Sequence, residues 1–172
     1  MIHLRVRPHN EKHIRITGID PVLLDSLHTV PEILEQRDTP AARARLLPDP
    51  TAADASINGE WQRLMAPELR HLFVSAGEIV TRDLTAIGPD AEQPQLREIT
   101  FPAEHLRAWM SALNQTRLIL GELFKVTEAD MERDDFDLKT PKGLAVFRIH
   151  ILGYLLQLLV ELEGGHESES SV

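Results

Sequence analysis

A long helical stripe with one arginine in it constrains the fold of this chain more than any other feature. Between Pro102 and Val126, side chains recur at alternating spacings of four and three residues, and these positions hold Leu106, Met110, Leu113, Arg117, Leu120 and Phe124. This spacing places all six on one face of a helix with Pro near its start. Leu118 and Ile119 point away from that face, so the helix is apolar on more than one side. We therefore predict a central helix with a charge placed among its leucines.

The rest of the chain predicts further helices and one hairpin. Within residues 1–19, apolar residues alternate with His, Arg and Thr on both sides of the turn-rich segment P-H-N-E-K, which is typical of a β-hairpin. Helical patterns begin near Asp20, Glu60 and Pro141. The Pro-containing segment 37–59 is interpreted as mostly connection, and residues 97–101 could add a third strand. The predicted fold class is mainly α: four or five helices packed around 102–126, with a small N-terminal β-hairpin.

The domain organisation follows from these elements. At 172 residues and 42% hydrophobic composition, the chain can bury one core. We predict a single helical domain over residues 1–165, with the hairpin as residues 1–19. Gly164 and Gly165 are expected to end the last helix, because Gly favours helix C-termini. The polar residues 166–172 are expected to form a disordered tail.

Composition limits the partners and the compartment. The net charge of -9 argues against nucleic acid, which binds basic surfaces, and the basic residues gather on the hairpin rather than on a helix. The chain has no cysteine, so a reducing cytoplasm is the expected location. The most apolar segment, Leu144–Val160, contains Arg148, His150 and Gln157. We therefore expect it to be a buried helix and not a membrane span.

The arginine in the central stripe leads to a candidate buried polar network. A guanidinium stays charged when buried, and removing it from water without a partner costs several kcal/mol. A carboxylate should therefore face Arg117. Glu68 lies within the apolar arc of its own helix and is the best candidate, and Asn114 is one turn from Arg117. The candidate network is Glu68, Asn114, Arg117, Asp49 and Glu60, with Glu122 as a further possible acid.

Two interpretations of this network remain open. In the first, it is a buried ion pair that fixes how the helices pack, which is a common role of buried networks. In the second, it is a pocket open to solvent, with Glu68 as acid or base and Arg117 and Asn114 as binders of an anion. The two differ in access, because a pocket must open to water.

Sequence motifs predict no catalytic residue, no cofactor and no metal ion. No phosphate-binding loop, dinucleotide fingerprint or nucleophile elbow is present, and the eight histidines follow no metal-binding spacing. His3, His9 and His13 could meet in the hairpin as an adventitious site. Asp130, Glu132 and Asp134 alternate as in a calcium loop, but Phe136 stands near the place of the required glycine. A solvated acidic turn is the simpler interpretation.

The last helix favours a protein-interaction function. Its apolar arc within residues 141–163 is wider than one packing face needs, so part of it should meet a partner or a second subunit. We therefore expect a non-enzymatic interaction, adaptor or regulatory domain that could form a homo-oligomer through 141–163. The alternative is a small enzyme or anion-binding protein that uses Glu68, Asn114 and Arg117.

Four segments resemble an uncharacterised bacterial family. They are R-L-L-P-D (45–49), E-W-Q-R-L (60–64), A-W-M-S-A-L-N-Q-T-R-L-I-L-G (108–121) and V-T-E-A-D (126–130). The family is the domain of unknown function DUF2017. The resemblance implies a cytoplasmic, mainly helical protein, and the family's frequent encoding near a Clp protease adaptor implies a link to proteolysis by association. It carries over no activity, substrate or cofactor. Where the family commonly has P-D-A-Y, this chain has Pro50 and Thr51.

Overall fold

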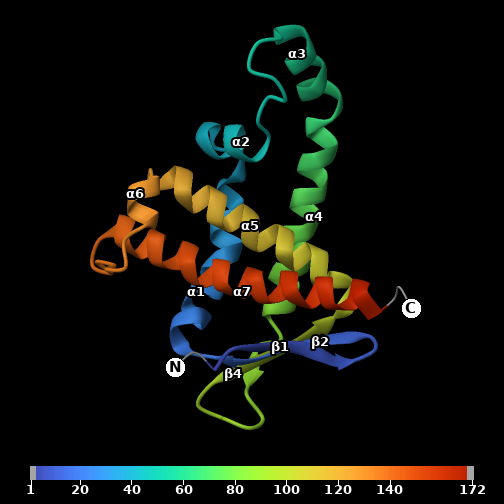
Figure 1. Cartoon of the computed structure of the whole chain (residues 1–172), viewed down its shortest axis with the longest axis vertical. Helices are drawn as coiled ribbons and strands as arrows, with labels where there is room; N and C mark the ends of the chain where they lie inside the picture. The colour runs from blue at the N-terminus through green and yellow to red at the C-terminus, as the bar shows by residue number, and fades with distance from the viewer. Residues whose placement is uncertain (1–2, 170–172) are drawn as a thin grey trace.

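The computed structural model describes the backbone of residues 3–169 and the side chains of residues 3–165. A small antiparallel sheet lies at one end of the long axis and helix α3 at the other, with α1, α5 and α7 between them (Figure 1). The strands are β1 (Arg5–Asn10), β2 (His13–Ile19), β3 (Gly88–Pro89) and β4 (Arg97–Pro102). The α-helices are α1 (Pro21–Glu35), α2 (Pro40–Leu46), α3 (Ala55–Leu64), α4 (Ala66–Leu84), α5 (Leu106–Leu123), α6 (Glu128–Met131) and α7 (Pro141–Glu169), and two 3-10 turns are η1 (Gln36–Asp38) and η2 (Ala103–His105).

The N-terminal hairpin is part of a four-stranded sheet with the order β1-β2-β4-β3. Ile14 of β2 pairs with Phe101 of β4, and Ile16 pairs with Ile99. All four side chains are at most 2% exposed, because the alternating pattern turns them toward the helices. The predicted hairpin and the third strand from 97–101 are confirmed. The prediction missed the fourth strand, since β3 has only two residues.

Helix α5 is central, as the sequence predicted. It packs against α1, α2, α4 and α7, and Trp109, Leu113 and Ile119 are completely buried on it. It begins at Leu106 and not at Pro102, because Pro102 ends β4 and 103–105 form η2. The mainly α class is confirmed, but the molecule is not a purely helical bundle, and residues 3–169 contain seven α-helices rather than four or five.

Further helix boundaries also differ from the prediction. Part of the segment expected to be mostly connection forms α2, which begins at Pro40 directly after Thr39. Helix α7 continues through Gly164 and Gly165 to Glu169, so the glycines do not end it. Both glycines have negative φ, since the positive-φ residues of the described chain are Gly18 and Lys125. The predicted tail therefore overlaps the helix over 166–169, and 170–172 lie outside the described residues.

Candidate functional site

The side chain of Arg117 extends from α5 toward α7 and is half-buried. Its Nε donates a hydrogen bond to the carbonyl oxygen of Ile149 at 3.0 Å. The guanidinium lies flat against Gly153, where an added Cβ would stand 3.0–3.1 Å from its Nε, Cζ and Nη2 atoms. Burial lowers the pKa of Arg117 from its ordinary value. A backbone carbonyl on α7, and not a carboxylate, is therefore its partner.

The expected polar network around Arg117 does not form. Across residues 3–165, Arg117 makes no ion pair with an acidic side chain. Asp49, Glu60, Glu68 and Asn114 are all exposed. Asp49 accepts a hydrogen bond from Gln62 at 3.0 Å, and the other candidate acid, Glu122, lies 3.8 Å from Arg45.

The physical reason is the direction of two side chains. Arg117 is only partly buried and donates to a backbone carbonyl, so it needs no buried counter-ion. Glu68 does lie on the apolar arc of its helix, but only the later part of that arc, with Ala76 and Val80, is buried. Glu68 lies on the first part of α4, which projects from the body and is exposed.

A cluster that sequence reasoning missed joins α4 to α5. The Asp83 carboxylate accepts a hydrogen bond from Trp109 Nε1 at 2.9 Å and lies 2.9 Å from His105 Nδ1. Trp109 is completely buried and stacks on Phe101 with ring centroids 4.7 Å apart. The signal in the sequence was a Trp within the central helix, since a buried indole N–H needs an acceptor. This cluster satisfies that need, and its role is structural.

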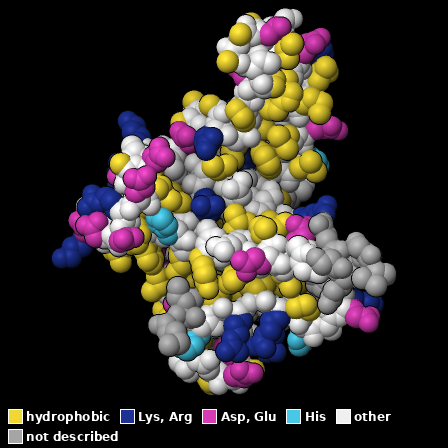
Figure 2. All heavy atoms as spheres, in the orientation of Figure 1, with side chains coloured by type: hydrophobic (Ala, Val, Ile, Leu, Met, Phe, Trp, Pro, Cys, Tyr) yellow, Lys and Arg dark blue, Asp and Glu magenta, His cyan; other side chains and the backbone are white. Residues whose placement is uncertain are grey.

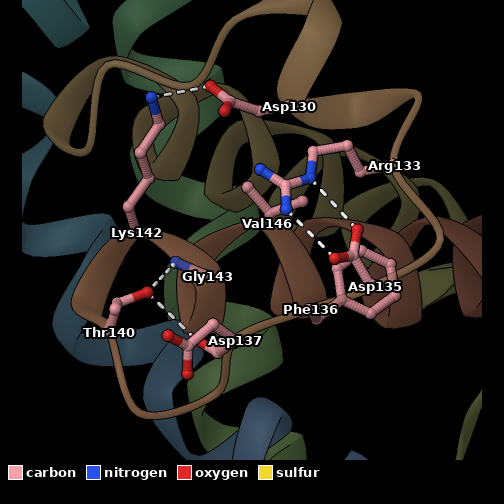
Figure 3. A pocket seen from close by; sticks show the side chains of 9 residues that line it. All are labelled: Asp130, Arg133, Asp135, Phe136, Asp137, Thr140, Lys142, Gly143 and Val146. Carbon is pink, nitrogen blue, oxygen red and sulfur yellow. Dashed lines mark hydrogen bonds and ion pairs between the residues drawn. The ribbon is translucent and has the colours of Figure 1, made fainter.

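The acidic loop before α7 forms a small pocket of about 130 Å³ (Figure 3). Lys142 pairs with Asp130 at 2.7 Å, and Arg133 pairs with Asp135 at 3.0 Å. The hydrogen bond from Lys142, followed by two from Thr127, lowers the pKa of Asp130 to about 2. Each of these carboxylates already has a cationic partner. In residues 3–165, His, Asp and Glu side chains form no group of three that could hold a metal ion.

A second hollow of about 240 Å³ lies on the outer face of the sheet. Arg15 pairs there with Glu98 at 2.6 Å. Asp90 is 4% exposed and accepts backbone N–H bonds from Gly18, Glu92 and Gln93. Burial raises the pKa of Asp90, but these bonds and Arg15 lower it by more, so it lies below its ordinary value. The carboxylates of this hollow hold the hairpin to the loop before β4.

The most distinctive surface lies on an arm formed by α3 and the start of α4. Asp54 caps α3 by accepting N–H bonds from Ser56 at 3.0 Å and Ile57 at 3.1 Å. The backbone stays helical at the junction, where Met65 N donates to Trp61 O at 2.8 Å and Leu69 N donates to Met65 O at 3.1 Å. These two bonds carry the chain from α3 into α4 across Met65, which belongs to neither helix.

Four large apolar side chains on this arm face water. The exposed fractions are 48% for Ile57, 55% for Leu64, 53% for Met65 and 63% for Leu72. We call these four residues the arm stripe. Positions 57, 64 and 72 recur at seven and eight residues, which returns them to one side of a helix. Figure 2 shows hydrophobic side chains gathered over the projecting upper part of the molecule.

Helix α7, the expected contact helix, buries one side within the chain. Leu152, Leu155 and Leu159 are completely buried in the core. On its outer side, Tyr154 is 39% exposed and Val160 is 51% exposed. By length and composition alone, residues 141–165 could cross a membrane, and a third of the most apolar window is buried inside the molecule. A core helix of a soluble protein has the same properties, so this observation is weak evidence for a span.

These features define a mainly α domain, built against a small antiparallel sheet, with a projecting apolar arm. The chain belongs to the family described as Domain of unknown function (DUF2017), whose model matches residues 14–162. This membership confirms the resemblance seen in the sequence. Comparisons with curated proteins and with solved structures gave no significant match.

Proposed function

We propose that this protein is a non-enzymatic protein-interaction domain of the bacterial cytoplasm, and that the arm stripe is its contact surface. The observation that carries the proposal is the exposure of Leu64, Met65 and Leu72, each more than half open to water. Keeping large apolar side chains in water costs free energy that a partner would recover. Because the arm projects from the body, a partner could reach the stripe without rearrangement of the core.

The self-association expected through 141–163 is a weaker version of the same proposal. The outer side of α7 offers Tyr154 and Val160, while Gln157 and Glu161 lie between them and bond to each other at 3.0 Å. Polar residues thus interrupt the outer surface of α7. The apolar side chains of the arm stripe extend over a longer part of the chain, from Ile57 to Leu72, so we favour the arm stripe as the contact surface.

The alternative of a small enzyme built on Glu68, Asn114 and Arg117 lacks the proximity that catalysis requires. General acid–base chemistry needs its groups within hydrogen-bond reach of one substrate atom. Glu68 lies on the exposed side of the arm, whereas Arg117 lies against Gly153 of α7. An interaction function is therefore the better proposal.

The proposal is tested by capture of partners in the native bacterium. A tagged full-length chain is compared with Leu64→Glu/Leu72→Glu, and Val22→Glu/Val160→Glu serves as the control on α1 and α7. All three should show the same circular dichroism. We expect the arm variant to lose its specific partner by at least about tenfold, equivalent to about 1.4 kcal/mol, and the control to retain it. Full retention by the arm variant would contradict the proposal.

The family's association with a Clp protease adaptor suggests which partner to examine first. If the protein acts in that pathway, the purified full chain should change the rate at which the Clp protease of the same bacterium degrades an adaptor-dependent substrate. Leu64→Glu/Leu72→Glu should abolish the change. An unchanged rate in the presence of the wild-type chain would remove this pathway and leave the interaction function to the capture experiment.

A further inference from the structure

The arm stripe is symmetric about the junction between α3 and α4. Ile57 lies as far before the midpoint of residues 64 and 65 as Leu72 lies after it, and Leu64 and Met65 flank that midpoint. Reversing the direction of the arm therefore exchanges Ile57 with Leu72 and Leu64 with Met65. A two-fold interface requires this property, because residue i must contact j while j contacts i.

We propose that the occupant of the arm stripe is a second copy of this chain, bound antiparallel about a two-fold axis at the 64/65 junction. This inference rests on the proposed function and deepens it by naming the partner. Ile57 of each copy would lie against Leu72 of the other, and Leu64 against Met65. Each large side chain in the stripe would then be covered by an apolar one, as hydrophobic association requires.

The charge of the arm favours two copies meeting there. Residues 55–72 contain Glu60 and Glu68 against Arg63 and Arg70, so their net charge is zero, and the rest of the chain carries the whole -9. Two acidic molecules repel each other through most of their surfaces. Contact through the arms brings two neutral segments together and keeps the acidic loop around Asp130 away from its equivalent.

The orientation of the stripe is also suitable. Ala66, Ala76 and Val80 of α4 are at most 7% exposed and pack toward the body, whereas Leu72 is 63% exposed although it lies only about 40° around the helix from Ala76. Leu72 is therefore open because the first part of α4 projects beyond the body (Figure 1), so a second copy could cover the stripe without disturbing the core. An interface of eight such side chains is small, and we expect a dimer that dissociates on dilution.

Cysteine cross-linking tests this geometry directly, because the chain has no cysteine of its own. In the proposed dimer, position 57 of one copy faces position 72 of the other. The two copies of position 57 are about 22 Å apart, the length of fifteen helical residues, which is far beyond disulfide reach. An oxidised mixture of Ile57→Cys and Leu72→Cys chains should therefore form covalent dimers at least about tenfold more than either variant alone. Val160→Cys, on α7, is the matched control.

Charge substitution gives an independent test. Sedimentation equilibrium of the full-length chain should show the 19.4 kDa monomer shifting toward twice that mass as concentration rises. Ile57→Glu and Leu72→Lys should each shift the equilibrium to monomer. The double variant Ile57→Glu/Leu72→Lys should restore the dimer, since the introduced carboxylate of each copy would then face the introduced ammonium group of the other. Val160→Glu should leave the equilibrium unchanged.

Each outcome decides between the proposals. A strict monomer at every concentration, equal cross-linking by the single variants, or cross-linking through Val160→Cys would overturn the arm dimer. If the monomer nevertheless loses its cellular partner in the Leu64→Glu/Leu72→Glu variant, the interaction function stands with a different occupant. If the arm dimer forms and no partner depends on the stripe, the dimer stands and the role in binding another protein fails.

Discussion

Asp83 and Trp109 are joined by a hydrogen bond of 2.9 Å from the indole N–H to the carboxylate, and this bond connects the end of α4 to the first turn of α5. The same carboxylate lies 2.9 Å from His105 Nδ1 at the turn that leads out of the sheet. Because Trp109 also stacks on Phe101 of β4, one carboxylate fixes the relative position of two helices and the sheet. Its side chain is only 10% exposed, so water does not replace the bond easily.

Loss of this carboxylate should destabilise the fold. Asp83→Ala leaves the buried indole N–H without an acceptor, and we expect a loss of about 2 kcal/mol in the free energy of unfolding. Asp83→Asn should cost less, because the amide oxygen still accepts a hydrogen bond. Urea denaturation at neutral pH measures both. In a Trp109→Phe background, Asp83→Ala should have a smaller effect, and an unchanged effect would show that the indole bond is not its cause.

Arg117 should tolerate replacement by an apolar side chain of similar length. Its burial lowers its pKa and therefore disfavours the charge, and its observed partner is a carbonyl. Arg117→Met removes the half-buried charge and keeps the stem, so we expect the free energy of unfolding to change by less than about 1 kcal/mol. Breaking a buried ion pair typically costs about 3–5 kcal/mol. A urea-denaturation loss of that size would instead support a hidden carboxylate partner.

Periodicity along the sequence predicted the elements that bury a regular face. Ile14 and Ile16 alternate with polar residues and form β2, and the leucine stripe forms α5. Local sequence rules failed at helix ends where more than one end position was possible. Gly164 permits a helix to stop but does not force it to, and α7 continues past it. Leu64, Met65 and Leu72 were predicted on the apolar arc of the helix that begins near Glu60, but Ile57 fell in the segment interpreted as connection. The exposure of these side chains depends on where α4 leaves the body.

The candidate site was less predictable, because it depends on contacts between distant segments. Arg117 and Ile149 are 32 residues apart, and nothing in the spacing of α5 indicates a carbonyl partner on α7. Asp83 and Trp109 are 26 residues apart in the chain, with β3 and β4 between them. The sequence predicts that a buried polar group needs a partner. It does not predict which partner the packing provides.

The lowered pKa of Asp130 should appear as a loss of stability in acid. Its folded pKa is about 2, below its ordinary value of 3.8. The contribution is therefore fully present above about pH 4 and is lost as the pH falls toward 2. The denaturation midpoint of the wild type should fall over this range, and Asp130→Asn should show a shallower fall because it cannot take up the proton. Parallel curves for the two proteins would contradict the assignment.

Gly18 should be the least replaceable glycine in the sheet. Its φ of 74° lies in the left-handed region, and an added Cβ would stand 2.2 Å from the carbonyl oxygen of His3. Gly18→Ala should therefore cost at least about 2 kcal/mol, combining the left-handed penalty with displacement of the backbone. Gly121→Ala is the matched control in α5, where an added Cβ has no neighbour within 4 Å. It should stabilise the fold by about 0.5 kcal/mol, because Ala favours a helix over Gly. Thermal unfolding of both variants distinguishes these outcomes, and equal melting temperatures would show that Gly18 of β2 does not approach His3 as closely as described.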